Sequence, residues 1–316
     1  MRRRKVIFIC GPTASGKSSL ALQLAKNLAS EMLIALINCD SVQVYEDLLI
    51  GSASPTREEK SICPHYLYNY IKFPDEVSVG SYYRDFAQTL ETIPEEYGLF
   101  VVGGSGFYLQ ALEFGLYDMP PVAEEVRQQV QSDLEKSGPG PLYEELKKHD
   151  PATASRIHIN DHYRLTRAVE VIRSNLTTMT AASEKKQKQF HLDVRKIGLR
   201  YEKTELLERV QTRTKQMLKS GLIEETRKML DLGRAQWAPL ASVGYLETKK
   251  FLQGELPQDQ LESEINLKTM QLIKKQLTWF KRDQEILWKE AGQVQDFQRD
   301  VREFLLGASQ IKVDNS

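Results

Sequence analysis

The sequence has 316 residues, with 43 basic and 43 acidic side chains, so its formal net charge at pH 7 is zero. Hydrophobic residues make up 41% and charged residues 27%, which is typical of folded domains and excludes collagen-like, low-complexity and wholly disordered chains. The zero net charge gives no general argument for a nucleic-acid or membrane partner, so any basic surface has to be local.

The N-terminal part of the chain alternates short β-rich apolar runs with longer helical patterns. Strands are predicted at 6–10, 33–39, 66–71 and 99–102, and helices at 17–29 and 81–92. This alternation is typical of βαβ units on a parallel sheet. We therefore predict an α/β fold with a parallel β-sheet flanked by helices.

The rest of the chain predicts an insert and a return to the core. A turn-rich segment at 118–122 precedes an interrupted helical pattern that runs to about 189, whereas 196–201 resembles a strand again. Helices are predicted at 203–232, 244–252 and 259–282, with little strand between them. The expected organisation is a first part of the core at 1–117, an inserted helical domain at 118–190 and the remaining core at 191–316.

The apolar runs and the cysteines bear on the location of the protein and on metal or disulfide sites. No apolar run approaches the roughly 18 residues of a membrane span, and we expect a cytoplasmic protein. The three cysteines, Cys10, Cys39 and Cys63, show no metal-ligand spacing and cannot all pair, so their expected role is packing.

One segment matches the phosphate-loop pattern G-x-x-x-x-G-K-[ST], directly after an apolar strand and at the start of a helix. Backbone N–H groups of such a loop wrap a phosphate, the lysine neutralises its oxygens and the hydroxyl binds Mg²⁺. The segment predicts a di- or triphosphate ligand with Mg²⁺, the alternative being a chance glycine-rich turn. It consists of Gly11, Pro12, Thr13, Ala14, Ser15, Gly16, Lys17 and Ser18.

Two further strand ends carry polar residues. Asp40 follows the second predicted strand, and Ser105 follows a later strand in a glycine-rich turn. The carboxyl ends of parallel strands face one crevice, so both side chains are expected beside the phosphate loop. Asp40 is interpreted as a general base, as an Mg²⁺ ligand or as a turn cap, and the Ser105 turn as ligand-facing or as a plain tight turn.

Two basic segments leave their role open. Arg164, Arg167 and Arg173 recur at helical spacing, which fits either contacts to a phosphate backbone or a solvated helix face. The last predicted helix combines lysines with Trp279 and Phe280, which fits either an RNA-facing patch or an amphipathic helix that buries its apolar side.

Several ordered blocks resemble the isopentenyl-tRNA transferase family, also called tRNA dimethylallyltransferases. The resemblance runs from about residue 5 to 283. The blocks are the phosphate loop, the segments 40–45, 50–56, 64–65, 103–108, 150–151 with 156–161, and 164–171, then Gly244-Tyr245 and 275–279.

The resemblance implies transfer of a dimethylallyl group from dimethylallyl diphosphate to the exocyclic amine of the adenosine 3′-adjacent to the anticodon. It implies Asp40 as the base, Lys17 and Ser18 at the diphosphate, Thr13 facing the donor and Ser105 near the reacting amine. A flipped adenosine is expected in a channel between core and insert, with Gln43 at its hydrogen-bonding edge. The positions matching tRNA contacts or lying near the acceptor are Asp40, Ser41, Val42, Gln43, Ser105, Arg127, Tyr163, Arg164, Leu165, Thr166 and Arg167.

Some positions depart from the family pattern. Ser54 stands where the family usually has lysine, Asn69 where it has an acid, and Met270 and Lys275 where it has arginines. Fewer basic groups near nucleic acid would weaken tRNA binding more than catalysis.

Two other functions compete with this hypothesis. An ATP-dependent kinase of a small metabolite or nucleotide would use the same loop, Mg²⁺ and acid, but the chain shows no arginine-bearing lid pattern. A non-catalytic RNA-binding or nucleotide-sensing protein would not need Lys17, Ser18 and Asp40 together. We expect a monomer that binds the tRNA anticodon stem-loop and dimethylallyl diphosphate, with no membrane partner.

Overall fold

The computed structural model describes residues 3–117, 122–174, 177–184, 186–188, 190–290 and 294–307. Contacts divide the chain into two compact units. The first unit comprises 1–113 and 190–316, and the second unit comprises 114–189, against the limits of 118 and 190 expected from the sequence. No helix among the described residues is long and apolar enough to cross a membrane.

The first unit is built on a six-stranded sheet in the order β3-β2-β4-β1-β7-β8, and every neighbouring pair is parallel. Buried apolar residues on both faces of β1, β2 and β4 suit a central parallel sheet. The predicted α/β fold with a parallel sheet is therefore confirmed. The strands are β1 (Arg4–Cys10), β2 (Ile34–Asn38), β3 (His65–Tyr66), β4 (Gly98–Gly103), β7 (Leu192–Arg200) and β8 (Ile286–Glu290).

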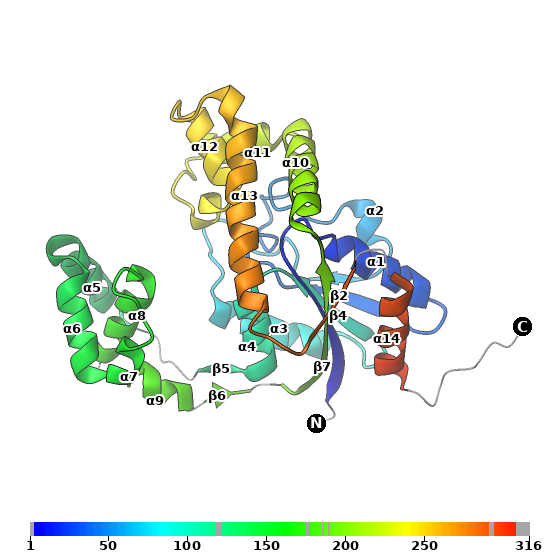
Figure 1. Ribbon diagram of the computed structural model, residues 1–316, viewed down its shortest axis with the longest axis horizontal. Helices are drawn as coiled ribbons and strands as arrows, with labels where there is room; N and C mark the ends of the chain where they lie inside the picture. Colours follow the sequence, from blue (N-terminus) through cyan, green and yellow to red (C-terminus); the bar gives the residue numbers. More distant parts are fainter. Residues whose placement is uncertain are drawn as a thin grey trace, which may run out of the picture. The chain divides into compact units, whose positions relative to one another are not determined.

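Helices cover both faces of this sheet. Figure 1 shows α1 (Lys17–Leu28) and α14 (Val294–Leu306) on one side, and α3 (Val79–Thr92) and α4 (Gly106–Phe114) on the other. Buried apolar side chains of α1, α14 and the sheet form one continuous core.

A group of helices lies beyond the end of the sheet at which β7 leads into α10 (Figure 1). A second apolar core joins these helices to the loop that follows β2. The group consists of α10 (Lys203–Lys219), α11 (Leu222–Asp231), the 3₁₀ turn η1 (Ala238–Ala241), α12 (Tyr245–Leu252) and α13 (Gln258–Phe280), while the short α2 (Arg57–Lys60) precedes β3.

Two predictions about elements were wrong. The strand expected at 66–71 stops after two residues, because Leu67 and Asn69 have positive φ angles of 60° and 52°. The single helix expected at 203–232 is two helices, because Gly221 adopts a φ of 103° between them. A strand, β8, and a helix, α14, follow α13, and neither was predicted from the sequence.

The second unit is a small helical bundle with its own apolar core. Its helices are α5 (Glu124–Ser137), α6 (Pro139–His149), α7 (Pro151–Ala154), α8 (His162–Arg173) and α9 (Met179–Glu184), and β5 (Leu116–Tyr117) pairs antiparallel with β6 (Lys186–Gln187). The buried Asp150 accepts hydrogen bonds from the backbone N–H groups of Thr153 and Thr180, and so begins α7 and ties it to α9.

Candidate active site

The strand ends bring the predicted site residues of the first unit together. Cys10 at the end of β1 pairs in register with Gly103 at the end of β4, and Asn38 at the end of β2 pairs with Val102. A Cβ atom on Gly103 would lie 1.8 Å from the carbonyl oxygen of Cys39, so only glycine allows this approach of β4 to β2. The phosphate loop, Asp40 and Ser105 therefore follow three neighbouring strands.

The phosphate loop is open at the start of α1. Gly16 precedes the helix with a φ of 80°, and no side chain caps the first N–H groups of α1. These N–H groups and the positive end of the helix dipole are available to an anion. Ser18 is exposed in the first turn, and Lys17 donates a hydrogen bond from Nζ to the carbonyl oxygen of Pro12, 2.7 Å away.

Side chains from α10 and α13 hold the loop from outside. Arg209 donates from Nε to the carbonyl oxygen of Ala14 at 2.8 Å, and its guanidinium lies 4.7 Å from the centre of the Tyr201 ring. Gln276 accepts a hydrogen bond from the N–H of Thr13 at 2.8 Å. Both contacts join residues that are far apart in sequence. Arg209 is separated from Ala14 by 195 residues, and Gln276 from Thr13 by 263.

Asp40 is fixed at both its backbone and its side chain. The buried Asn38 accepts from the N–H of Asp40 at 2.9 Å and donates to its carbonyl oxygen at 3.1 Å. One carboxylate oxygen, Oδ1, accepts from the N–H of Val42 at 2.9 Å. The turn-cap interpretation therefore holds for Oδ1, and Oδ2 is left to face a ligand.

Ser105 lies against the segment that carries Asp40. Its hydroxyl accepts a hydrogen bond from the N–H of Ser41 at 3.2 Å, and its own N–H donates to Cys39. The glycine turn thus contacts the Asp40 segment directly.

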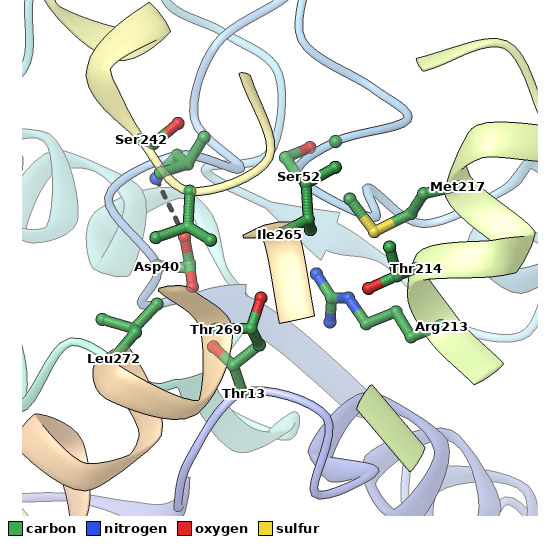
Figure 2. A pocket seen from close by; sticks show the side chains of 13 residues that line it. Thr13, Asp40, Ser52, Arg213, Thr214, Met217, Ser242, Ile265, Thr269 and Leu272 are labelled. Carbon is green, nitrogen blue, oxygen red and sulfur yellow. Dashed lines mark hydrogen bonds between the residues drawn. The ribbon is translucent and has the colours of Figure 1, made fainter. Parts of the chain in front are cut away.

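A pocket of about 80 Å³ lies between the phosphate loop, the loop after β2 and helices α10 and α13. Figure 2 shows the side chains of Asp40, Arg213 and Thr269 pointing into it. The lining combines charged and polar side chains such as Asp40 and Arg213 with apolar ones such as Met217 and Ile265, so the pocket suits a ligand that has both charged and hydrocarbon parts. Its lining consists of Thr13, Asp40, Val42, Gly51, Ser52, Arg213, Thr214, Met217, Ser242, Val243, Ile265, Thr269 and Leu272.

Two cations face one carboxylate at this pocket. Burial lowers the pKa of Lys17 to about 8, while Asp40 acts in the opposite direction and Arg213 in the same one. Burial also lowers the pKa of Arg213, against the effect of Asp40. Among the described residues, Arg213 has no ion-pair or hydrogen-bond partner, which is costly for a half-buried guanidinium unless an anion binds there.

The chemistry of these residues fits Mg²⁺ beside a diphosphate. Magnesium keeps several waters and needs only one or two protein ligands when phosphate oxygens supply others. The exposed Ser18 hydroxyl at the start of α1 would provide one ligand, and the described residues hold no cluster of three acidic, histidine or cysteine side chains that would form a separate cage.

Other predicted site residues have structural partners. The amide nitrogen of Gln43 donates to the carbonyl oxygens of Ser52 and Ala53, at 3.1 and 2.8 Å, and so braces the loop that contains them. The three cysteines are buried and unpaired, as expected. Trp279 and Phe280 pack inward while Lys274 and Lys275 are exposed, which matches the amphipathic interpretation of α13.

The arginines predicted to bind RNA lie in the second unit, and each has an acidic partner. Arg164 and Arg167 on α8 pair within one turn, with Asp161 at 3.2 Å and Glu170 at 3.0 Å. Arg127 on α5 lies 3.6 Å from Glu124. Tyr163, beside Arg164, is 81% exposed, so this end of α8 presents an aromatic ring and a cation to solvent.

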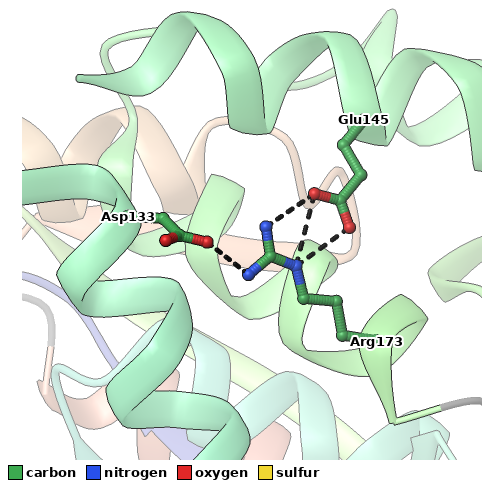
Figure 3. Close-up of polar contacts among 3 residues, drawn as sticks. All are labelled: Asp133, Glu145 and Arg173. Carbon is green, nitrogen blue, oxygen red and sulfur yellow. Dashed lines mark hydrogen bonds and ion pairs between the residues drawn. The ribbon is translucent and has the colours of Figure 1, made fainter. Parts of the chain in front are cut away.

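Arg173 does not share that exposed surface. Its guanidinium donates to Asp133 on α5 and to Glu145 on α6, at 2.6 and 2.7 Å (Figure 3). It links three helices of the bundle, which gives it a structural role in the second unit.

Sequence reasoning missed three residues of this site: Arg209, Arg213 and Gln276. The first two were read as part of one long helix with no local motif. Gln276 lies in a block that resembles the family, yet its spacing gave no indication that it contacts the phosphate loop.

The model of the IPP transferase family matches residues 43–283. A tRNA dimethylallyltransferase of Bdellovibrio bacteriovorus is 45% identical over 292 residues, which cover 91% of this chain and 94% of the relative. A tRNA dimethylallyltransferase 2 of Syntrophus aciditrophicus is 35% identical and covers 97% and 98% of the two chains.

Among solved structures, the full-length tRNA isopentenylpyrophosphate transferase of Bacillus halodurans superposes with a TM-score of 0.70 at 26% identity, covering 97% of this chain and 98% of the other. A eukaryotic dimethylallyltransferase acting on tRNA shares the fold, with a TM-score of 0.80 at 23% identity over 96% and 80% of the chains. With relatives of this similarity over nearly its whole length, and the family pattern over residues 43–283, the chain belongs to the IPP transferase family.

Proposed function

We propose that this chain transfers a dimethylallyl group from dimethylallyl diphosphate to the exocyclic N6 amine of the adenosine 3′-adjacent to the anticodon of tRNA, releasing diphosphate. The observation that carries the proposal is that Asp40 and the unpaired Arg213 line one partly apolar pocket beside the phosphate loop. Such a pocket suits an allylic diphosphate, and its named relatives are tRNA dimethylallyltransferases.

The donor diphosphate would bind at the phosphate loop. Backbone N–H groups at the start of α1, Lys17 and Arg213 provide positive potential on two sides of it. These groups stabilise the charge that accumulates on the diphosphate as it leaves. Thr13 belongs to the phosphate loop and lines the pocket, where it would face the donor.

Asp40 would act on the acceptor. The adenine amine is a weak nucleophile, because its lone pair is delocalised into the ring. As the bond from N6 to the allylic carbon forms, the bond from that carbon to the diphosphate oxygen breaks, and Oδ2 of Asp40 takes the N6 proton. The hydroxyl of Ser105, held beside Asp40 by the N–H of Ser41, is placed to contact the same amine.

Mg²⁺ is the proposed cofactor, with Ser18 as its protein ligand. When bound, it would neutralise charge on the leaving diphosphate. Transfer is therefore expected to stop when EDTA removes the metal and to recover when Mg²⁺ is restored.

The tRNA anticodon stem-loop is the proposed acceptor, bound in part by the exposed start of α8. The two arginines there are flanked by Tyr163, Leu165 and Thr166. Of these, Leu165 is buried, and the hydroxyl of Thr166 donates to the carbonyl oxygen of Tyr163. Arg127 is proposed near the acceptor, also from the family resemblance.

We propose that the enzyme acts as a monomer in the cytoplasm, where its tRNA substrate is available. Light scattering of the purified protein tests whether it is a monomer.

The test combines purified protein, Mg²⁺, labelled dimethylallyl diphosphate and an unmodified anticodon stem-loop, followed by mass analysis of the nucleosides. A dimethylallyl group on the adenosine next to the anticodon is the expected result. The kinase alternative would be supported if no transfer occurs and phosphate is released from ATP in the presence of a small-molecule acceptor. The named relatives of this chain do not favour that alternative.

A further inference from the structure

One side chain of α13 contacts both loops that carry the proposed chemistry. The side-chain oxygen of Gln276 accepts from the N–H of Thr13 in the phosphate loop at 2.8 Å. Its side-chain nitrogen donates to the carbonyl oxygen of Gly104 in the turn after β4 at 3.1 Å. A single amide group therefore bridges two segments that come from different strands.

The packing around this bridge leaves little room for movement. A Cβ atom on Gly104 would lie 2.5 Å from the side-chain nitrogen of Gln276 and 3.4 Å from the carbonyl oxygen of Gly11. Trp279 lies one turn after Gln276 on α13, and a Cβ atom on Gly106 would lie 2.1 Å from its indole ring. Helix α13 is thus seated on the glycine turn at two successive points.

The two bridged loops have separate parts in the reaction. Thr13 belongs to the loop that would hold the donor diphosphate. Gly104 directly precedes Ser105, whose hydroxyl accepts from the N–H of Ser41 next to Asp40. The distance between the loops therefore determines how far the departing carbon is from the base.

We propose that Gln276 is a positioning residue that fixes the phosphate loop relative to the Ser105 turn, and so aligns donor and acceptor for transfer. This inference rests on the proposed function. A neutral amide suits the role, because it accepts and donates at once and adds no charge beside the diphosphate. Asparagine is one methylene shorter, and a glutamate cannot donate to Gly104 when ionised.

Two variants and one control test this role in the stem-loop assay. Gln276→Met keeps the approximate volume and removes both hydrogen bonds, whereas Gln276→Glu keeps the shape and the acceptor for Thr13. Gln260→Met makes the same change at an exposed position near the start of α13. The readouts are kcat, the KM for the stem-loop and the thermal midpoint of the full-length protein.

Gln276→Met is expected to lower kcat by about 100-fold, since a displacement of about 1 Å between reacting groups has an effect of that size. Gln276→Glu should lower kcat by about tenfold through the lost donor. Both should keep a near-normal KM and thermal midpoint, and Gln260→Met should match the wild type in all three.

Two results would overturn the inference. One is a normal kcat in folded Gln276→Met or Gln276→Glu protein, and the other is a raised KM with unchanged kcat, which would assign Gln276 to RNA binding. If the wild-type protein itself transfers nothing, the proposed function fails first. A wild type that transfers and Gln276 variants that transfer equally well would disprove only the positioning role.

Discussion

Asp40 combines a structural role with its proposed role as the base in one carboxylate. Oδ1 accepts from the N–H of Val42 and orders the turn after β2, and the buried Asn38 holds the backbone of Asp40 from both sides. Neither contact uses Oδ2, so the base can be rigid and still free to take a proton. A rigid base needs little rearrangement during the reaction, which favours catalysis.

Replacing Asp40 with asparagine should separate these roles. Asp40→Asn keeps an oxygen that can accept from Val42 but removes the basic carboxylate, so kcat is expected to fall by about 100-fold or more with stem-loop affinity retained. Single-turnover transfer and filter binding measure the two quantities. The exposed Asp259→Asn on α13 is the matched control. Near-normal turnover in Asp40→Asn would remove Asp40 as the base.

Lys17 predicts a pH dependence of diphosphate binding. Burial lowers its pKa to about 8, so the amine is mostly protonated at pH 7 and mostly neutral at pH 9. A bound diphosphate favours the protonated form, so affinity should fall as pH rises through about 8, by up to about tenfold per pH unit. Calorimetric titration with diphosphate and Mg²⁺ at pH 7 and pH 9 checks this. In Lys17→Met, diphosphate binding should be weak at both pH values. If the variant loses as much affinity between pH 7 and pH 9 as the wild type does, the pH effect belongs to another group.

Two departures from the family pattern prove to be neighbours. The side-chain nitrogen of Asn69 donates to the hydroxyl of Ser54 at 2.9 Å, and that hydroxyl lies 2.8 Å from the one of Ser52. The Ser54 hydroxyl thus has neutral partners inside the protein, and the expectation that the missing lysine weakens tRNA binding stays a prediction. A sequence shows two odd residues, and only the fold shows that they meet.

At the scale of elements, one carboxylate organises the loop that closes the pocket. Glu225 on α11 accepts from the N–H groups of Leu49, Ile50 and Gly51 and from the hydroxyl of Tyr245 on α12. A Cβ atom on Gly51 would lie 2.4 Å from the Tyr245 ring. The block Gly244-Tyr245 that resembles the family is therefore explained by packing against this loop.

Gly51→Ala should destabilise the first unit by about 1–3 kcal/mol, because the added methyl group overlaps the Tyr245 ring in a packed core. Urea unfolding of the full chain followed by circular dichroism measures the loss. Gly80→Ala in the first turn of α3 is the control, since its added Cβ meets only side-chain tips at 3.8 Å. Equal midpoints for the two variants would show that the Tyr245 ring moves aside at little cost.

The sequence predicted elements where a local pattern exists and failed where the third dimension decides. The strands β1, β2 and β4 and the helix α1 have apolar runs and a helix start at the phosphate loop, and they were found with small errors at their ends. The break at Gly221 was missed because a single glycine within a helical pattern is ambiguous. The short apolar run of β8 forms a strand only because β7 offers it an edge.

At the scale of the whole molecule, the same contrast separates the two halves of the candidate site. The phosphate loop and Asp40 are local features of strand ends and could be predicted. Arg209, Arg213 and Gln276 come from helices far along the chain, and no local spacing marks them. The predicted chemistry lies in the first unit, whereas the exposed aromatic and basic end of α8 belongs to the second.

This division predicts that tRNA affinity and turnover can be lost independently. Arg164→Ala should weaken stem-loop binding and lower the salt slope of log affinity by about 0.7–0.9, the loss of one phosphate contact. Its kcat at saturating stem-loop should stay near that of the wild type, the opposite of Asp40→Asn. Lys147→Ala on α6, which removes another exposed cation of the second unit paired within one turn, is the control for total charge. An unchanged salt slope in Arg164→Ala would show that this end of α8 is a solvated helix face, where Arg164 pairs with Asp161 and does not contact RNA.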